Sequence, residues 1–102
     1  MAKPTTNALE ILRRRAKHDP ELQRLYEEEK VNLQVALLIR KVREELGLTQ
    51  GELAKRIRTT QSVISRLEDA DYEGHSLSIL QRIASALKQK ITITMNPIKH
   101  AP

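Results

Sequence analysis

The stretch LTQGELAKRIRTTQSVISRLED, residues 48–69, contains two short apolar segments joined by a polar turn. Thr49 and Glu52 have the spacing of a capping box, which predicts the start of a helix, and Thr59 or Thr60 is suited to cap a second one. The side chains expected to face a core are Leu53, Ala54, Ile57, Val63, Ile64 and Leu67. Helices this short are marginal alone, so packing against neighbours must hold them in place.

The second of these segments has a polar face opposite its apolar one. At about 100° per residue the side chains expected on that polar face are Gln61, Ser62, Ser65 and Asp69, with Arg66 at its flank. Amides, guanidinium groups and small hydroxyls suit contacts with base edges and phosphates. A helix braced across the DNA backbone and a next helix in the major groove form a helix-turn-helix, and the two segments predict this arrangement.

The composition is typical of one small domain with an anionic partner. The chain has 102 residues, no cysteine, two aromatic residues and a formal net charge of +5. Residues 1–32 carry a net charge of +1 and residues 33–102 a net charge of +4, so the excess positive charge accompanies the two capped segments. A mainly helical core of aliphatic side chains is expected. A cytoplasmic protein is also expected, because neither a signal sequence nor a membrane-spanning run is visible.

Enzymatic function finds no support in the residue pattern. The three histidines lie in separate polar stretches without metal-ligand spacing, and no glycine-rich phosphate loop or nucleophile elbow occurs. We therefore expect a protein that is not an enzyme and has no metal or other cofactor.

The first 30 residues predict a helical extension. Residues 1–7 are expected to be a loose end and residues 8–17 a short helix, after which Asp19 can cap a new helix with Pro20 at its first position. The apolar side chains of the extension are Leu9 and Leu12 in the first helix and Leu22, Leu25 and Tyr26 in the second. Acidic residues follow at positions 27–29, and they read equally well as an exposed turn or as a mimic of nucleic acid.

From Val31 onward the helical pattern strengthens and ends at Gly47. One apolar stripe is expected, made by Val35, Leu38, Ile39, Val42 and Leu46, with Arg43 among the charged residues mostly off it. The sequence leaves open whether this helix continues the one that starts at Pro20, because Asn32 is either a break or an exposed residue. Ser76 is expected to cap a last helix, whose apolar residues are Leu77, Leu80, Ile83, Ala84 and Leu87.

Near the C-terminus the spacing of apolar residues changes from a helical pattern to strict alternation. In residues 90–95 apolar and polar side chains alternate strictly, and Pro97 closes the run, which predicts a β-strand. No second strand is visible in the chain, so the expected partner is the same strand of another copy, with dimerisation through Ile91, Ile93 and Met95.

Residues 46–87 resemble the lambda-repressor-like, Xre-type helix-turn-helix domains in three stretches, LGLTQGELAKRI, TTQSVISRLE and LQRIASAL. The resemblance implies that Gln50 contacts phosphate and steadies the recognition helix, and that Ala54 is the small residue where two helices cross. The residues expected at the DNA are Gln50, Arg58, Thr60, Gln61, Ser62, Ser65 and Arg66.

Two positions depart from that family pattern. Arg58 stands where the family usually has the turn glycine, and a left-handed backbone there costs a non-glycine residue about 1 kcal/mol or somewhat more. The loop after the recognition helix carries Asp69, Asp71 and Glu73, where many relatives place basic phosphate contacts. Non-specific affinity for DNA is therefore expected to be modest.

The whole chain is similar to HigA-type antitoxins of bacterial toxin–antitoxin operons. This resemblance implies a RelE- or HigB-like mRNA endonuclease toxin as partner, bound by residues 8–30 through Leu9, Leu12, Leu22, Leu25 and Tyr26, and a homodimer that represses its own operon at an inverted repeat. The expected organisation is an all-α, lambda-repressor-like bundle over residues 31–89, with a toxin-binding extension over residues 1–30 and a dimerising β-strand with its tail over residues 90–102.

Two other functions remain open at this point. One is a free-standing Xre-type transcriptional repressor without a toxin, and the other is an interaction adaptor whose helix-turn-helix no longer binds DNA. The neighbouring gene in the operon distinguishes the free-standing repressor from the antitoxin, because an antitoxin gene is expected to lie beside a toxin gene. Salt-dependent operator binding separates both DNA-binding functions from the adaptor.

Overall fold

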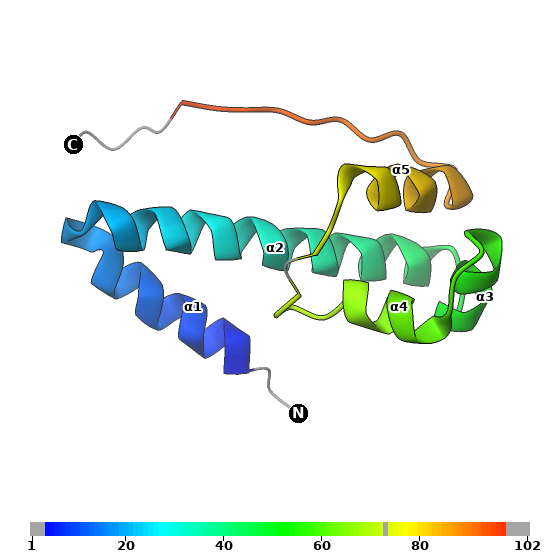
Figure 1. Cartoon of the computed structure of the whole chain (residues 1–102), viewed down its shortest axis with the longest axis horizontal. Helices are drawn as coiled ribbons and strands as arrows, with labels where there is room; N and C mark the ends of the chain where they lie inside the picture. Colours follow the sequence, from blue (N-terminus) through cyan, green and yellow to red (C-terminus); the bar gives the residue numbers. More distant parts are fainter. Residues whose placement is uncertain (1–3, 73, 98–102) are drawn as a thin grey trace.

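The structure is a computed structural model that describes residues 4–72 and 74–97 (Figure 1). Its elements are α1 (Pro4–Arg15), a 3₁₀ turn (Ala16–His18), α2 (Pro20–Glu45), α3 (Gln50–Arg56), α4 (Gln61–Leu67) and α5 (Leu77–Ala86). The fold of the described residues is all-helical, as the apolar pattern predicted.

Helix α2 is continuous over 26 residues, which answers the question left open at Asn32. It begins where the sequence indicates, because the Asp19 carboxylate accepts hydrogen bonds from the backbone N–H groups of Glu21 at 3.0 Å and Leu22 at 3.4 Å. It ends before Gly47, whose φ of +71° is the left-handed conformation that glycine adopts readily. The boundary expected after residue 30 thus falls inside one helix.

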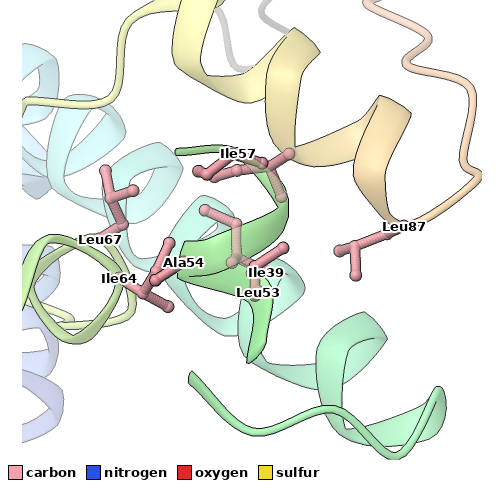
Figure 2. Packing of buried hydrophobic residues seen from close by; sticks show 8 residues of the cluster. Ile39, Leu53, Ala54, Ile57, Ile64, Leu67 and Leu87 are labelled. Atoms are coloured by element: carbon pink, nitrogen blue, oxygen red, sulfur yellow. The ribbon is translucent and has the colours of Figure 1, made fainter. Parts of the chain in front are cut away.

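Four helices share one aliphatic core, as expected. Figure 2 shows its buried side chains converging from α2, α3, α4 and the end of α5. The cluster consists of Ile39, Leu53, Ala54, Ile57, Ile64, Leu67, Ile83 and Leu87. Leu53 and Ile64 are completely enclosed, so the two short helices α3 and α4 are held by the burial of their apolar faces.

The buried face of α2 agrees only in part with the one that its apolar pattern predicts, because Val35 and Val42 do pack against the core. Leu38 and Leu46 are 59% and 49% exposed, so assigning them to the core stripe was wrong, whereas Ile39 is buried as predicted. Ala36 and Arg43 are buried in their place. The reason is tertiary, since α3, α4 and α5 pack on one side of a long helix that carries leucines on more than one side.

Helix α1 begins earlier than expected. The structure starts it at Pro4 rather than at Ala8, and proline is favourable at a first helical position because it has no N–H group to leave unpaired. Residues 1–3 of the expected loose end lie outside the described residues. Helices α1 and α2 pack against each other as a hairpin, with Ala16 buried at their junction (Figure 1).

The expected C-terminal β-strand is not formed in the described part of the chain. Residues 88–97 form no strand, and after α5 they continue as an extended trace in Figure 1. Ile93 and Met95 are 65% and 94% exposed. An alternating pattern gives a segment two faces but does not supply the backbone hydrogen bonds of a ladder, which need a second strand.

Candidate nucleic-acid interface

Helices α3 and α4 begin at the caps that the sequence predicts. The Thr49 hydroxyl accepts from the Glu52 N–H at 3.0 Å, and the Glu52 carboxylate accepts from the Thr49 N–H at 2.8 Å, which completes a capping box. Of the two candidate threonines before α4, Thr60 is the cap, with its hydroxyl accepting from the Val63 N–H at 3.3 Å. These caps fix where both helices start.

The turn between the two helices is tight and includes a strained residue. The Thr59 N–H donates to the Ala54 carbonyl at 2.8 Å, and Ala54 is buried among the core residues that α3 and α4 share. Arg58 has a φ of +59°, so the left-handed backbone expected at the usual glycine position is present. Its side chain is exposed.

Helix α4 has the two faces that its sequence predicts. Ile64 and Leu67 are buried in the core, and the side chains on the opposite face are exposed: Gln61, Ser62, Ser65 and Arg66. The fold therefore brings together a short row of amide, hydroxyl and guanidinium groups on a helix that is anchored from behind. Thr60 is also exposed but its hydroxyl is used as the cap. The contacts of these residues with DNA stay a prediction.

A buried ion pair that the sequence did not predict joins α2 to the end of α4. Arg43 donates from Nε to Oε2 of Glu68 at 2.6 Å and from Nη2 to Oε1 at 2.9 Å. Both side chains are nearly inaccessible, with 9% and 3% of their surface exposed. The hydrogen bonds that Arg43 donates to Glu68 raise the pKa of Arg43 above its already high usual value, so the guanidinium is charged.

The same carboxylate also fixes the start of α3. Gln50 donates from Nε2 to Oε1 of Glu68 at 3.1 Å, and Arg43 donates from Nη1 to the Leu48 carbonyl at 2.6 Å. Gln50 was expected to steady the recognition helix, and its bond to the C-cap residue of α4 has the geometry for that role. Its expected phosphate contact stays a prediction.

The sequence contains a weak signal for this buried ion pair. Arg43 follows the core residue Ile39 by four positions, and Glu68 follows Ile64 by four, so each charge occupies a core-facing position of its helix. A charged residue at such a position is expected to be paired when it is buried. The two charged residues of opposite sign at core-facing positions are therefore the sequence signal for the Arg43–Glu68 ion pair.

The loop after α4 is folded back on itself. The Asp69 carboxylate accepts from the Asp71 N–H at 2.9 Å, and a ring nitrogen of His75 lies 2.6 Å from the Leu67 carbonyl at the end of α4. Asp69 and Asp71 are exposed, as expected for an acidic loop, and Glu73 lies outside the described residues. Two negative charges therefore flank the exit of α4.

The expected toxin-binding and dimerisation residues lie on other parts of the molecule. Leu9, Leu12, Leu22 and Tyr26 are half-buried in the α1–α2 hairpin, and Leu25 is 37% exposed. Ile91 is half-buried, in contrast to the exposed Ile93 and Met95. Both assignments stay predictions.

Comparison with known proteins agrees with the geometry of α3 and α4. The helix-turn-helix family HTH_3 matches residues 39–93, just over half of the chain. The chain belongs to this family, whose match covers the core and the capped pair of helices.

A relative supports the same assignment. Over 50 residues the chain is 52% identical to an uncharacterized HTH-type transcriptional regulator of Methanothermobacter thermautotrophicus, and the match covers 49% of this chain and 71% of the relative. No solved structure matches the chain. Among residues 4–72 and 74–97, no helix has the length and apolar character needed to cross a membrane.

Proposed function

We propose that this protein is a transcription regulator that recognises a specific DNA site through the exposed face of α4. The observation that carries the proposal is the anchoring of that face: α4 is buried behind it, capped by Thr60 at its start and tied by Glu68 to α2 and α3 at its end. Recognition needs side chains held in a fixed register, and this arrangement supplies it.

Each exposed group of α4 has a defined chemistry toward DNA. The Gln61 amide can pair with the adenine edge, and the Arg66 guanidinium can pair with guanine or with a phosphate. Ser62 and Ser65 are small and allow the helix to approach closely. A homodimer would place two such helices in successive major grooves, about 34 Å apart, on an inverted repeat.

The test is binding of the full chain to DNA from upstream of its own gene, measured by fluorescence anisotropy at several salt concentrations. Replacement of Arg66 by alanine should weaken binding to the preferred sequence by about 5- to 150-fold, because a base-edge contact contributes about 1–3 kcal/mol. The matched control is Arg14→Ala, which removes the same charge from an exposed position on α1.

Two results would contradict the proposal. One is equal affinity for upstream and scrambled DNA, which would leave only sequence-independent attraction. The other is an equal loss of affinity in Arg66→Ala and Arg14→Ala, because total charge rather than the face of α4 would then determine binding.

A second candidate, the antitoxin of a toxin–antitoxin pair, is favoured by the α1–α2 hairpin. Most of this hairpin precedes the family match at residues 39–93, and it exposes apolar side chains: Ile11 is 50% exposed, Leu25 37% and Val31 54%. Its acidic residues are partly engaged within α2, since Glu27 accepts from Gln23 and Glu28 pairs with Arg24. The apolar residues are therefore the better basis for a protein contact.

The antitoxin proposal is tested by co-expressing a tagged full chain with its native flanking genes and identifying the proteins that co-purify. A small basic protein encoded next door, lost when Leu25 and Val31 are both replaced by aspartate, would support it. Purification of this chain alone would favour the regulator without a toxin partner, with operator binding unaffected.

A further inference from the structure

A hollow between the end of α3 and one side of α5 is lined by basic and polar side chains. The polar residues that line it are Arg56, Arg58, Ser78, Gln81, Arg82 and Ser85. No carboxylate is among the residues that line it. Three arginines thus line one depression together with serine and glutamine residues whose side chains can also donate hydrogen bonds.

Two of the arginines are fixed by the backbone of neighbouring elements. Arg82 on α5 donates from Nη2 to the Ile57 carbonyl at the end of α3, and Arg56 on α3 donates from Nη1 to the Ala86 carbonyl at 3.3 Å. Each guanidinium has five N–H donors, so these bonds orient the group and leave further donors for a ligand.

The three arginines have no ion-pair partner in the part of the chain that the structure describes. Four other arginines do: Arg13, Arg24, Arg40 and Arg43 each pair with a glutamate. The acid whose charge reaches Arg56 is Glu52, and its carboxylate is used in the capping box of α3. Glu52 stays charged in the capping box and partly offsets Arg56, so the three arginines still carry excess positive charge, and a bound anion would reduce their mutual repulsion.

Arg58 adds a second argument, because it stands in a backbone conformation that favours glycine. Its φ of +59° is unfavourable for an arginine, because the side chain then crowds its own backbone. No hydrogen bond or ion pair of its side chain with another described residue offsets this cost. Strained backbone positions cluster at ligand-binding sites, and Arg58, unlike the similarly strained Lys88, lines the hollow.

We propose that this hollow binds a phosphate group through Arg56, Arg58 and Arg82. Guanidinium groups bind phosphate oxygens by paired, charge-assisted hydrogen bonds, and the Ser78 and Ser85 hydroxyls are further donors at the same depression. The phosphate belongs either to a DNA backbone or to a free phosphate compound, which share this chemistry. The binding itself does not depend on recognition of an operator by α4.

The experiment is an NMR titration of the full chain with inorganic phosphate, at an ionic strength held constant with sodium chloride. Saturable shifts are expected at the backbone amides of Arg58, Ser78 and Ser85. Arg58→Gly should weaken phosphate binding about tenfold or more, because a hydrogen bond to a charged group is lost. Lys88→Gly is the matched control, since Lys88 is also a cation at positive φ, 55°, but does not line the hollow.

The source of the phosphate is distinguished by a second titration with a 20-base-pair duplex of arbitrary sequence. If the duplex shifts the amides of the hollow and excess phosphate reverses the shifts, the phosphate belongs to a DNA backbone. If phosphate shifts these amides and the duplex does not, the ligand is a free phosphate compound. Absence of both shifts, or equal weakening in Arg58→Gly and Lys88→Gly, overturns the proposal. The amides of Gln61 and Ser65 report α4 separately, so failure at one site is distinguishable from failure at the other.

Discussion

At the scale of single residues, two arginines depart from what their local sequence would favour. Arg43 is a charge in the core of the bundle, and Arg58 is a side chain in a left-handed turn. Burial of Arg43 is tolerated because Glu68 neutralises it and the Leu48 carbonyl takes a third hydrogen bond. The pair does not by itself imply high stability, but it fixes the orientation of α4 on α2, since the charges can be satisfied in one arrangement.

Removal of the negative partner should therefore be costly. We expect Glu68→Gln to lower the free energy of unfolding by about 3 kcal/mol, because Arg43 then remains buried without a counter-charge. Urea denaturation followed by circular dichroism measures this change.

The matched control is Glu28→Gln, which breaks the exposed Arg24–Glu28 pair on the same long helix. That change should cost less than about 0.5 kcal/mol, because surface pairs contribute little. Similar costs in the two variants would mean that the Arg43–Glu68 pair is not held in a buried site.

At the scale of elements, short helices are specified by their ends. Helices α3 and α4 have seven residues each, and every one of α3, α4 and α5 starts at a threonine or serine whose hydroxyl accepts a backbone hydrogen bond. A cap satisfies an N–H group that the first turn leaves unpaired. The helix starts predicted from the sequence are confirmed at Thr49, Thr60 and Ser76.

The capping box of α3 predicts a pH effect. The Thr49 backbone N–H, and then its hydroxyl, lower the pKa of Glu52 below the ordinary glutamate value of about 4.3. A lowered folded-state pKa gives stability that is present above the unfolded-state value and is lost as the pH falls through the folded-state value.

Glu52→Gln should therefore be less stable than the wild type at pH 7, and the difference should shrink as the pH falls below about 4. Denaturation midpoints of both proteins at pH 7, 5, 4 and 3 measure it. A difference that stays constant across this range would show that the carboxylate charge has no part in the cap.

At the scale of the whole molecule, the chain is more elongated than a compact domain of its length. Its Cα radius of gyration is 15.5 Å, against about 13 Å for a compact chain of 100 residues. The core cluster contains no residue of α1, and α1 packs against α2. The helix-turn-helix bundle and the α1–α2 hairpin therefore share α2 but have separate apolar contacts.

Deletion of residues 1–18 tests this separation, since it removes α1 and keeps the Asp19 cap of α2. We expect the bundle to unfold cooperatively and to retain DNA affinity within about twofold, while the amides near Leu22 and Tyr26 exchange faster with solvent. Hydrogen exchange and DNA binding measure the two effects. Loss of cooperative unfolding would show that the hairpin and the bundle form one folding unit.

The sequence predicted more at the helix starts than along the helix faces. Caps depend on residues within three positions of one another, so Thr49 with Glu52 and Asp19 with Pro20 could be recognised directly. The face of α2 depends on three helices that pack on it from distant parts of the chain. That dependence is why Leu38 was wrongly assigned to the core, and why Arg43 was placed mostly off its buried stripe.

The sequence by itself determined the all-helical class, the caps and the polar face of α4, because these follow from local spacing and residue type, and its resemblance to known domains indicated the helix-turn-helix family. Only the tertiary structure decided that α2 is continuous, that Arg43 meets Glu68, that three arginines share one hollow and that residues 90–97 make no strand within the chain. Each of these depends on which distant segments come together, and the packing of the whole chain settles that choice.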